Sequence, residues 1–338
     1  MANRYKWISL FATNFLGVFN DNFLKNSIIF ISVSWLLPSW LSQSQLISVV
    51  ASALVVPYLL FSPIGGRLAV RYSKLKVFRI LKLVEIPIML LACVAFYYQW
   101  VIVAVLSVFA LGTQSCLYSP SKYSLIRDIG GEEGASYGSG MFETMAFMGI
   151  LLGTFVASVV SDHYSLGLFG LIALGVAVLG YYSSKTIRAV ELPEEQSQSS
   201  IVNPILFVMA NYRYARNYRL VNSAVFGSSA FWLIANMVQM NIIIHCKGHY
   251  QTSNSMTGVV MACAAVGIAI GTGITGNVMG EKVNKGLILP ALAGMIAALL
   301  VVVFIPLSFP AFVGMVVVFA FMAGMFQVPC MCRFFRRI

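Results

Sequence analysis

The chain has 338 residues, of which 59% are apolar and 10% are charged, and its mean hydropathy is +0.85. Soluble domains average roughly 45–50% apolar and about 25% charged residues, so the composition excludes a water-soluble globular core. Several apolar runs reach about 20 residues, the length that crosses a hydrocarbon layer of roughly 30 Å, and the short alternating segments of a β-barrel are missing. The sequence therefore predicts an all-α polytopic membrane protein.

Apolar runs bounded by charged, proline or turn residues predict ten membrane-spanning helices. They are Trp7–Leu37, Leu46–Gly65, Leu81–Tyr98, Val101–Leu117, Tyr137–Val160, Leu166–Tyr182, Leu220–Ile244, Met256–Val278, Leu287–Leu307 and Phe312–Val328. The net charge of +11 is unevenly placed: if Arg4 and Lys6 lie inside, 20 of the 22 Lys and Arg lie on that side. The positive-inside rule then places both termini in the cytoplasm, and topology accounts for the charge without a nucleic-acid partner.

The longest hydrophilic stretch, 183–200, has the composition of a flexible linker. It predicts a six-helix bundle over 1–182 and an incomplete C-terminal bundle of four helices over 220–338. Within the connecting region, 183–219, Asn203 is placed to cap a short helix with Pro204 in its first turn. The apolar residues of this helix precede three arginines, so we expect an amphipathic helix at the membrane interface.

An internal repeat supports this division. The segment GRLAVRYSKLK from Gly66 has a counterpart GNVMGEKVNKG from Gly276, an offset of 210, and Pro120 corresponds to Pro329 at an offset of 209. Two parallel repeats of this size predict a 6+6 transporter. The partners of the fifth and sixth helices would fall at about 347–392, beyond Ile338, so we expect the second repeat to be truncated after four helices.

The first helix contains the polar segment FNDNFLKN, residues 19–26. At about 1.5 Å per residue, Asp21 lies some 21 Å from Trp7, close to the middle of the bilayer. A charge there costs roughly 2.5–3.5 kcal/mol on insertion scales. Asp21 and Lys25 are one helical turn apart and are expected to neutralise each other, with Asn14 on the same face. Two interpretations remain open: a substrate or ion site, or a structural polar clasp between helices.

Other polar residues lie in or near the predicted spans. Glu143 in the fifth helix is a candidate proton carrier, or a structural partner of Lys122 or Arg127. Glu85 is three residues from Lys82, which favours an ion pair at the membrane boundary over a role in transport. Gln114 in the fourth helix is a candidate cavity residue, although such side chains commonly form hydrogen bonds between helices.

Motifs of enzyme chemistry and metal binding are missing from the sequence. Gly271, Gly273 and Gly276 spell a dinucleotide-binding pattern, but they lie in an apolar span without a preceding strand, where close helix packing is the better interpretation. The six cysteines lack the spacing of a disulfide framework or a metal site. We therefore predict no catalytic residue, no metal and no cofactor.

Four segments together resemble the lysophospholipid transporter branch of the major facilitator superfamily: FNDNFLKN, GGRLAVRYSKLKVFR, GTQSCLYSPSKYSLI and FETMAFMGILLGT. The resemblance implies the major facilitator fold of two six-helix repeats and the transfer of lysophosphatidylethanolamine and related lipids from the outer to the inner leaflet of the bacterial inner membrane. There an acyltransferase restores the second chain. The resemblance points to Asp21 and Lys122 as functional positions. The chain departs from the superfamily motif at Val70, where the motif carries an acid.

The expected function is lysophospholipid transport by alternating access, with membrane lipids and a lysolipid acyltransferase as partners. The candidate substrate and translocation residues are Asn14, Asp21, Asn22, Lys25, Gln114, Lys122 and Glu143. Asp21 would bind the ammonium of the headgroup, and Lys25 or Lys122 the phosphate. Two alternatives stay open: a proton-coupled exporter of another amphipathic solute with Glu143 as carrier, and a truncated membrane protein that does not transport.

Overall fold

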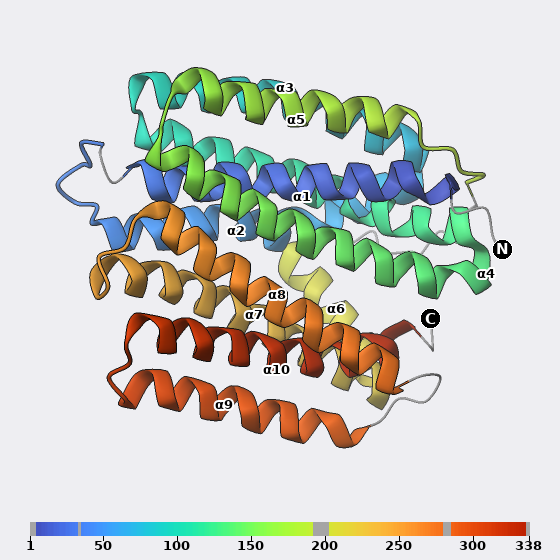
Figure 1. Cartoon of the computed structure of the whole chain (residues 1–338). Coiled ribbons are helices and arrows are strands. Elements are labelled where there is room, and N and C mark those ends of the chain that lie inside the picture. Colours follow the sequence, from blue (N-terminus) through green and yellow to red (C-terminus); the bar gives the residue numbers. More distant parts are fainter. Residues whose placement is uncertain (1–4, 33–34, 192–202, 280–284, 336–338) are drawn as a thin grey trace. The chain divides into compact units, whose positions relative to one another are not determined.

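The computed structural model describes residues 5–32, 35–191, 203–279 and 285–335. Regular structure in these ranges is entirely helical, and the chain divides into two compact units, Met1–Val208 and Met209–Ile338. The first unit contains α1 (Tyr5–Ile31), α2 (Gln43–Arg71), α3 (Lys74–Tyr98), α4 (Val101–Asp162) and α5 (Leu166–Lys185) (Figure 1). Helix α6 (Pro204–Arg216) contains the boundary between the units. The second unit continues with α7 (Arg219–Gly248), α8 (Asn254–Met279), a 3-10 turn (Lys285–Leu287), α9 (Ile288–Phe304) and α10 (Phe309–Phe335).

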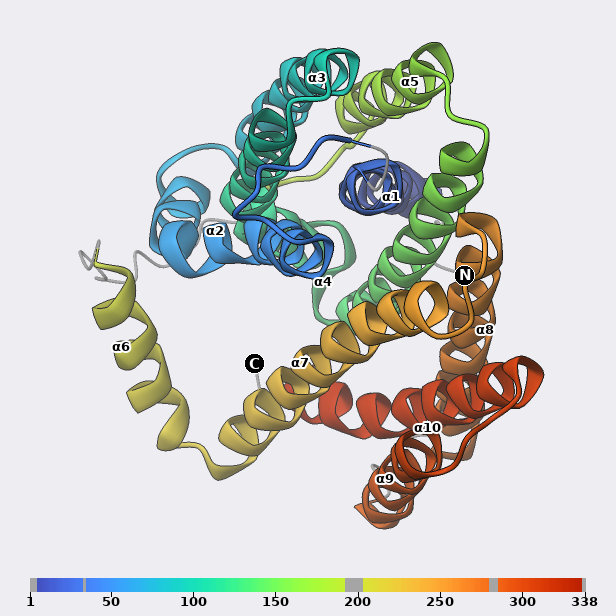
Figure 2. The same cartoon turned by 90° about the vertical axis from the view of Figure 1, so that its left-hand side faces the viewer.

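Helix α1 lies inside the first unit. It packs mainly against α4 and α5, and Figure 2 shows it end-on with α3, α4 and α5 around it. Residues at its start, including Trp7 and Leu10, belong to a buried cluster with Phe78 of α3 and Tyr118 of α4. Because protein surrounds α1, its polar residues face other helices, which explains how a membrane helix can hold so many of them.

Helix α4 consists of two arms joined at Gly131. This residue has φ 62° and ψ −168°, a conformation that only glycine adopts readily. The chain reverses direction there, so the two arms run in opposite directions through the unit (Figure 1). The first arm continues past the expected end at Leu117, through Pro120, and the predicted connection between the fourth and fifth spans is therefore helical. With both arms counted, the first unit holds the six expected segments.

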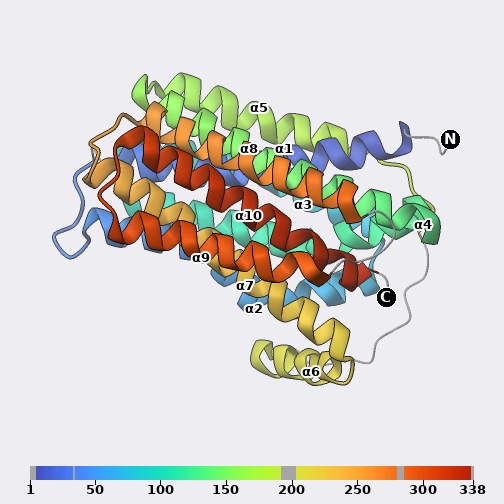
Figure 3. The ribbon, with the colours of Figure 1, turned by 60° about the horizontal axis from the view of Figure 1, so that its bottom comes forward.

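The helix pairings of the second unit repeat those of the first. Helix α10 packs on α8, α9 and α7 (Figure 3), just as α4 packs on α2, α3 and α1. Close backbone contacts recur as well: a Cβ on Gly112 would lie 2.5 Å from the Leu54 carbonyl oxygen, and a Cβ on Gly324 would lie 2.5 Å from that of Ile268. The order of the helices, and the spacing along the chain between the equivalent glycines Gly112 and Gly324, agree with the predicted repeat. The segment GNVMGEKVNKG from Gly276 is the second copy of the repeated segment, and most of its side chains lie outside the described part of the chain.

Eight described helical segments are long and apolar enough to cross a membrane. They are Gln43–Arg71, Lys74–Tyr98, Val101–Gly131, Thr144–Asp162, Leu166–Lys185, Val225–Gly248, Asn254–Thr272 and Phe309–Gln327. Two further helices complete the ten that the sequence predicts. Helix α9 is apolar but has 17 residues, and α1 has 27 residues but a central polar segment. The all-α polytopic fold is confirmed.

The structure corrects two predictions at the end of the first unit that carries the basic residues: the start of α3 and the flexibility of the segment after α5. Helix α3 begins at Lys74 rather than at Leu81, because the Ser73 hydroxyl and the Glu191 carboxylate bind its first backbone N–H groups. Glu191 accepts hydrogen bonds from the backbone N–H groups of Lys74 at 2.7 Å and Leu75 at 3.2 Å. The predicted flexible linker is consequently wrong for 183–191; residues 192–202 lie outside the described ranges.

The segment after α5 is held at several points. Ile187 is fully buried, and its carbonyl oxygen accepts a hydrogen bond from Arg79 at 3.0 Å. Nearby, Lys74 forms an ion pair with Asp128 at 3.0 Å that ties α3 to α4. Partial burial raises the pKa of the Glu191 carboxyl, but the hydrogen bonds from Ser73 and the α3 backbone outweigh this and hold the pKa below its ordinary value.

Candidate functional site

The polar segment of α1 is fastened to its neighbours through asparagines. The Asn20 amide donates hydrogen bonds to Glu85 Oε1 of α3 at 2.7 Å and to the Ala173 carbonyl oxygen of α5 at 3.2 Å. The Asn26 amide binds Thr154 Oγ1 on the second arm of α4 at 2.9 Å. Helix α1 therefore has a fixed rotation in the first unit, which determines where its charged residues point.

Asp21 and Lys25 do not form the predicted ion pair within the described residues. Asp21 instead accepts a hydrogen bond from the Ser115 hydroxyl, 3.1 Å from Oδ2. Ser115 also lies 3.2 Å from Gln114 Oε1, and the Gln114 amide donates to the Leu81 carbonyl oxygen at 2.9 Å. Ser115 on α4 occupies the carboxylate in place of a contact ion pair, although the Asp21 charge still acts on Lys25 electrostatically.

Lys25 is buried, with 4% of its surface exposed. The described residues provide its ammonium with neither a hydrogen bond nor an ion pair. Asn22 is also buried, and its amide donates to the Val18 carbonyl oxygen in its own helix at 2.9 Å. Neither residue faces the lipid, and both lie on the buried side of α1.

Lys122 meets the other end of the polar face of α1. Its ammonium donates to Asn14 Oδ1 at 3.2 Å, while the Asn14 amide donates to the Phe142 carbonyl oxygen at 2.9 Å. The rings of Tyr118, Tyr123 and Phe142 have their centroids 5.1–5.4 Å from the ammonium, within the range of cation–π attraction. The candidate residue Glu143 lies on the same arm as Phe142, but its side chain is outside the described part of the chain.

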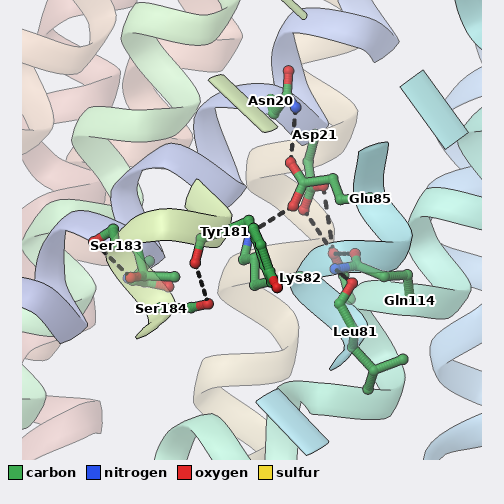
Figure 4. A network of polar contacts seen from close by, with 12 residues as sticks. Asn20, Asp21, Leu81, Lys82, Glu85, Gln114, Tyr181, Ser183 and Ser184 are labelled. Atoms are coloured by element: carbon green, nitrogen blue, oxygen red, sulfur yellow. Dashed lines mark hydrogen bonds and ion pairs between the residues drawn. The ribbon is translucent and has the colours of Figure 1, made fainter. Parts of the chain in front are cut away.

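The predicted ion pair between Lys82 and Glu85 is confirmed. The ammonium and Glu85 Oε2 are 2.7 Å apart, and both side chains are 1% exposed. Because α3 begins at Lys74, Lys82 lies two turns inside the helix. Figure 4 shows Asp21 and Glu85 directed into one polar region, with Lys82 beside Glu85.

The Lys82 ammonium occupies a notch that α1 leaves open at Gly17. A Cβ at Gly17 would lie 2.4 Å from the Lys82 ammonium nitrogen and 3.2 Å from the Tyr118 hydroxyl oxygen. Sequence reasoning did not include Asn20, Lys82 or Glu85 in the site. The signal in the sequence was Glu85, an acidic residue in the apolar run after Lys82. Its place in the site becomes evident only in the structure, where α3 begins at Lys74 and both residues lie well within the helix.

Charged and polar residues from α1, α3 and α4 thus converge inside one helical unit of a polytopic membrane protein, an arrangement typical of transporters. The family model of the Major Facilitator Superfamily matches residues 10–333. The chain belongs to this superfamily.

Two curated relatives are named lysophospholipid transporter LplT. The relative from Yersinia enterocolitica serotype O:8 / biotype 1B is 24% identical over 329 residues, covering 95% of this chain and 76% of the relative. The relative from Yersinia pestis (strain Pestoides F) is 22% identical over 326 residues with the same coverage.

Solved structures share the fold at low sequence identity. The human organic anion transporter MFSD10 (TETRAN) has a TM-score of 0.71 at 13% identity and covers 97% of this chain and 85% of its own. The nucleoside transporter NupG has a TM-score of 0.66 at 10% identity, covering 96% of this chain and 80% of its own. These matches agree with the major facilitator fold predicted from the sequence.

Proposed function

We propose that the chain moves lysophospholipids of the lysophosphatidylethanolamine type across a bacterial inner membrane by alternating access, with both termini in the cytoplasm. Membership of a transporter superfamily and the curated relatives named lysophospholipid transporter support the proposal. The observation that carries it is a difference in exposure among the charged residues of the first unit. Asp21 and Lys122 are partly exposed, whereas Lys25, Lys82 and Glu85 are buried.

The charges of these two residues are complementary to a zwitterionic headgroup. Asp21 would bind the ammonium, and Lys122 the phosphate. Before the lipid binds, Ser115 holds the Asp21 carboxylate and Asn14 holds the Lys122 ammonium. Asn14 and Asp21 are seven residues apart on α1, or about 10 Å along its axis. Asp21 would add an ionic partner to its hydrogen bond from Ser115, which offsets the cost of removing the headgroup ammonium from water. The acyl chain of the lysolipid would remain in apolar surroundings. The lysolipid delivered to the inner leaflet would then be the substrate of an acyltransferase.

Uptake of labelled lysophosphatidylethanolamine into proteoliposomes tests the proposal. We expect Asp21→Asn to abolish most of the uptake, because the amide keeps the size of the side chain but not its charge. Wild-type uptake in the variant would refute the site on α1. Wild-type protein that responds to a pH gradient but not to lysolipid would instead support the export of another amphipathic solute.

Lys25 and Lys122 are alternative partners for the phosphate, and matched substitutions separate them. We expect Lys122→Met to lower uptake strongly. We expect Lys25→Met to have a smaller effect, because Lys25 is buried and forms no hydrogen bond or ion pair with the described residues, although the Asp21 charge acts on it. The opposite result would assign the phosphate to Lys25.

A further inference from the structure

Helix α6 has a well-formed beginning and an exposed apolar surface. Asn203 Oδ1 accepts hydrogen bonds from the backbone N–H groups of Ile205 at 3.0 Å and Leu206 at 3.3 Å, and Pro204 occupies the first turn, as the sequence predicts. The large apolar side chains of α6 that are more than 45% exposed are Ile205, Leu206, Val208, Met209 and Tyr212. Such an exposed apolar surface is unfavourable in contact with water.

The charge of α6 is of one sign. Arg213 and Arg216 lie in its last turn, Arg219 follows at the start of α7, and the sequence from Asn203 to Tyr218 contains neither Asp nor Glu. Cations near the carboxyl end also suit the helix dipole. An apolar first half followed by a basic last turn matches a bilayer surface, where side chains enter the acyl boundary and arginines reach the headgroups.

The position of α6 along the chain places it close to a membrane. The apolar stretch of α7 follows Arg219 directly, beginning at Leu220 in the sequence. The end of α6 at Arg216 is three residues before Arg219. This short connection keeps the carboxyl end of α6 close to the headgroups, so the bilayer is an apolar and charged surface within reach of the helix.

We propose that α6 binds the surface of the bilayer and that Arg213 and Arg216 make this binding selective for anionic phospholipid headgroups. The apolar side chains supply attachment to any bilayer, and the arginines add the dependence on lipid charge. Each basic residue near an anionic leaflet strengthens binding roughly five-fold, so the two together give about 30-fold. The added attraction declines with salt because it is electrostatic.

Amide hydrogen exchange of the full chain in lipid nanodiscs tests this proposal. One set of nanodiscs contains phosphatidylcholine, and the other contains phosphatidylcholine with phosphatidylglycerol. We expect exchange over 204–216 to be up to about 30-fold slower with phosphatidylglycerol, and the difference to shrink at high salt. The double variant Arg213→Gln/Arg216→Gln should lose the difference between the lipids but keep protection in both.

A matched control removes two exposed basic residues elsewhere, in the double variant Lys76→Gln/Arg188→Gln. This variant should retain the lipid-dependent protection of α6. Equal exchange of the wild-type helix in the two lipids would overturn the proposal, as would loss of the difference in the control variant. The measurement needs no lysolipid, so its result is independent of the proposed transport function.

Discussion

The Lys82 ammonium and the Glu85 carboxylate form an ion pair of 2.7 Å in the interior of the first unit, where both side chains are 1% exposed. A third residue, Asn20 of α1, donates to the other carboxylate oxygen at 2.7 Å. The pair therefore joins α3 to the helix that carries Asp21. Its burial means that each charge depends on the other for its stability.

Removing one partner of this pair should destabilise the protein strongly. We expect Lys82→Met or Glu85→Gln alone to cost about 3–5 kcal/mol, because each leaves a buried charge without its counter-ion. The double variant restores neutrality and keeps an acceptor for Asn20, so it should be more stable than either single variant. Thermal unfolding in detergent measures all three. A double variant that loses the sum of the two single effects would show that the charges are not coupled.

The approach of α1 to the second arm of α4 should depend on Gly153. A Cβ there would lie 2.4 Å from the Phe19 carbonyl oxygen, and a backbone atom cannot rotate away. Gly153→Ala should lower the free energy of unfolding by about 1–3 kcal/mol. Gly175→Ala in α5, where nothing lies within 4 Å of the new Cβ, is the matched control and should be neutral or stabilising by up to about 1 kcal/mol.

If Asp21 binds the headgroup, Ser115 should affect substrate affinity. Its hydroxyl is the donor that holds the Asp21 carboxylate in place. We expect Ser115→Ala to raise the KM for lysolipid about 10- to 150-fold, because a hydrogen bond to a charged group contributes about 1.5–3 kcal/mol. Among the described residues, Ser107 of the same helix donates only to the Val103 carbonyl oxygen, so Ser107→Ala should leave the KM unchanged. Equal effects of the two substitutions would argue against a role for Ser115 at Asp21.

The contact of Glu191 with the start of α3 should depend on pH. Its pKa in the folded protein lies below the unfolded value, so the contact stabilises the protein above the ordinary glutamate range of about 4.3 and is lost as the pH falls through the lowered pKa. Glu191→Gln should therefore lower the thermal midpoint at pH 7 and have little effect near pH 3. The expected cost at pH 7 is about 0.5–1 kcal/mol, typical of an anion at a helix N-terminus. A difference that stays constant across this range would show that the carboxylate charge is not responsible.

Residue patterns along the chain were sufficient for the fold class, the ten helical segments, the repeat and the cap at Asn203. These features follow from local physics: an apolar run of sufficient length must cross the bilayer as a helix, and the run and its ends can be recognised without knowledge of its neighbours. The polar segment of α1 was recognisable for the same reason, since a charge in such a run is costly wherever the helix packs.

Partners between helices were decided by the tertiary structure. Helical spacing predicts that Asp21 meets Lys25, yet Asp21 meets Ser115. Hydropathy predicted a helix from Leu81, yet α3 begins at Lys74, where Ser73 and Glu191, more than 100 residues later, bind its first backbone N–H groups. The sequence specifies distances within a helix, but the rotation of one helix against another depends on packing at positions such as Gly17 and Gly153, which no local pattern reveals.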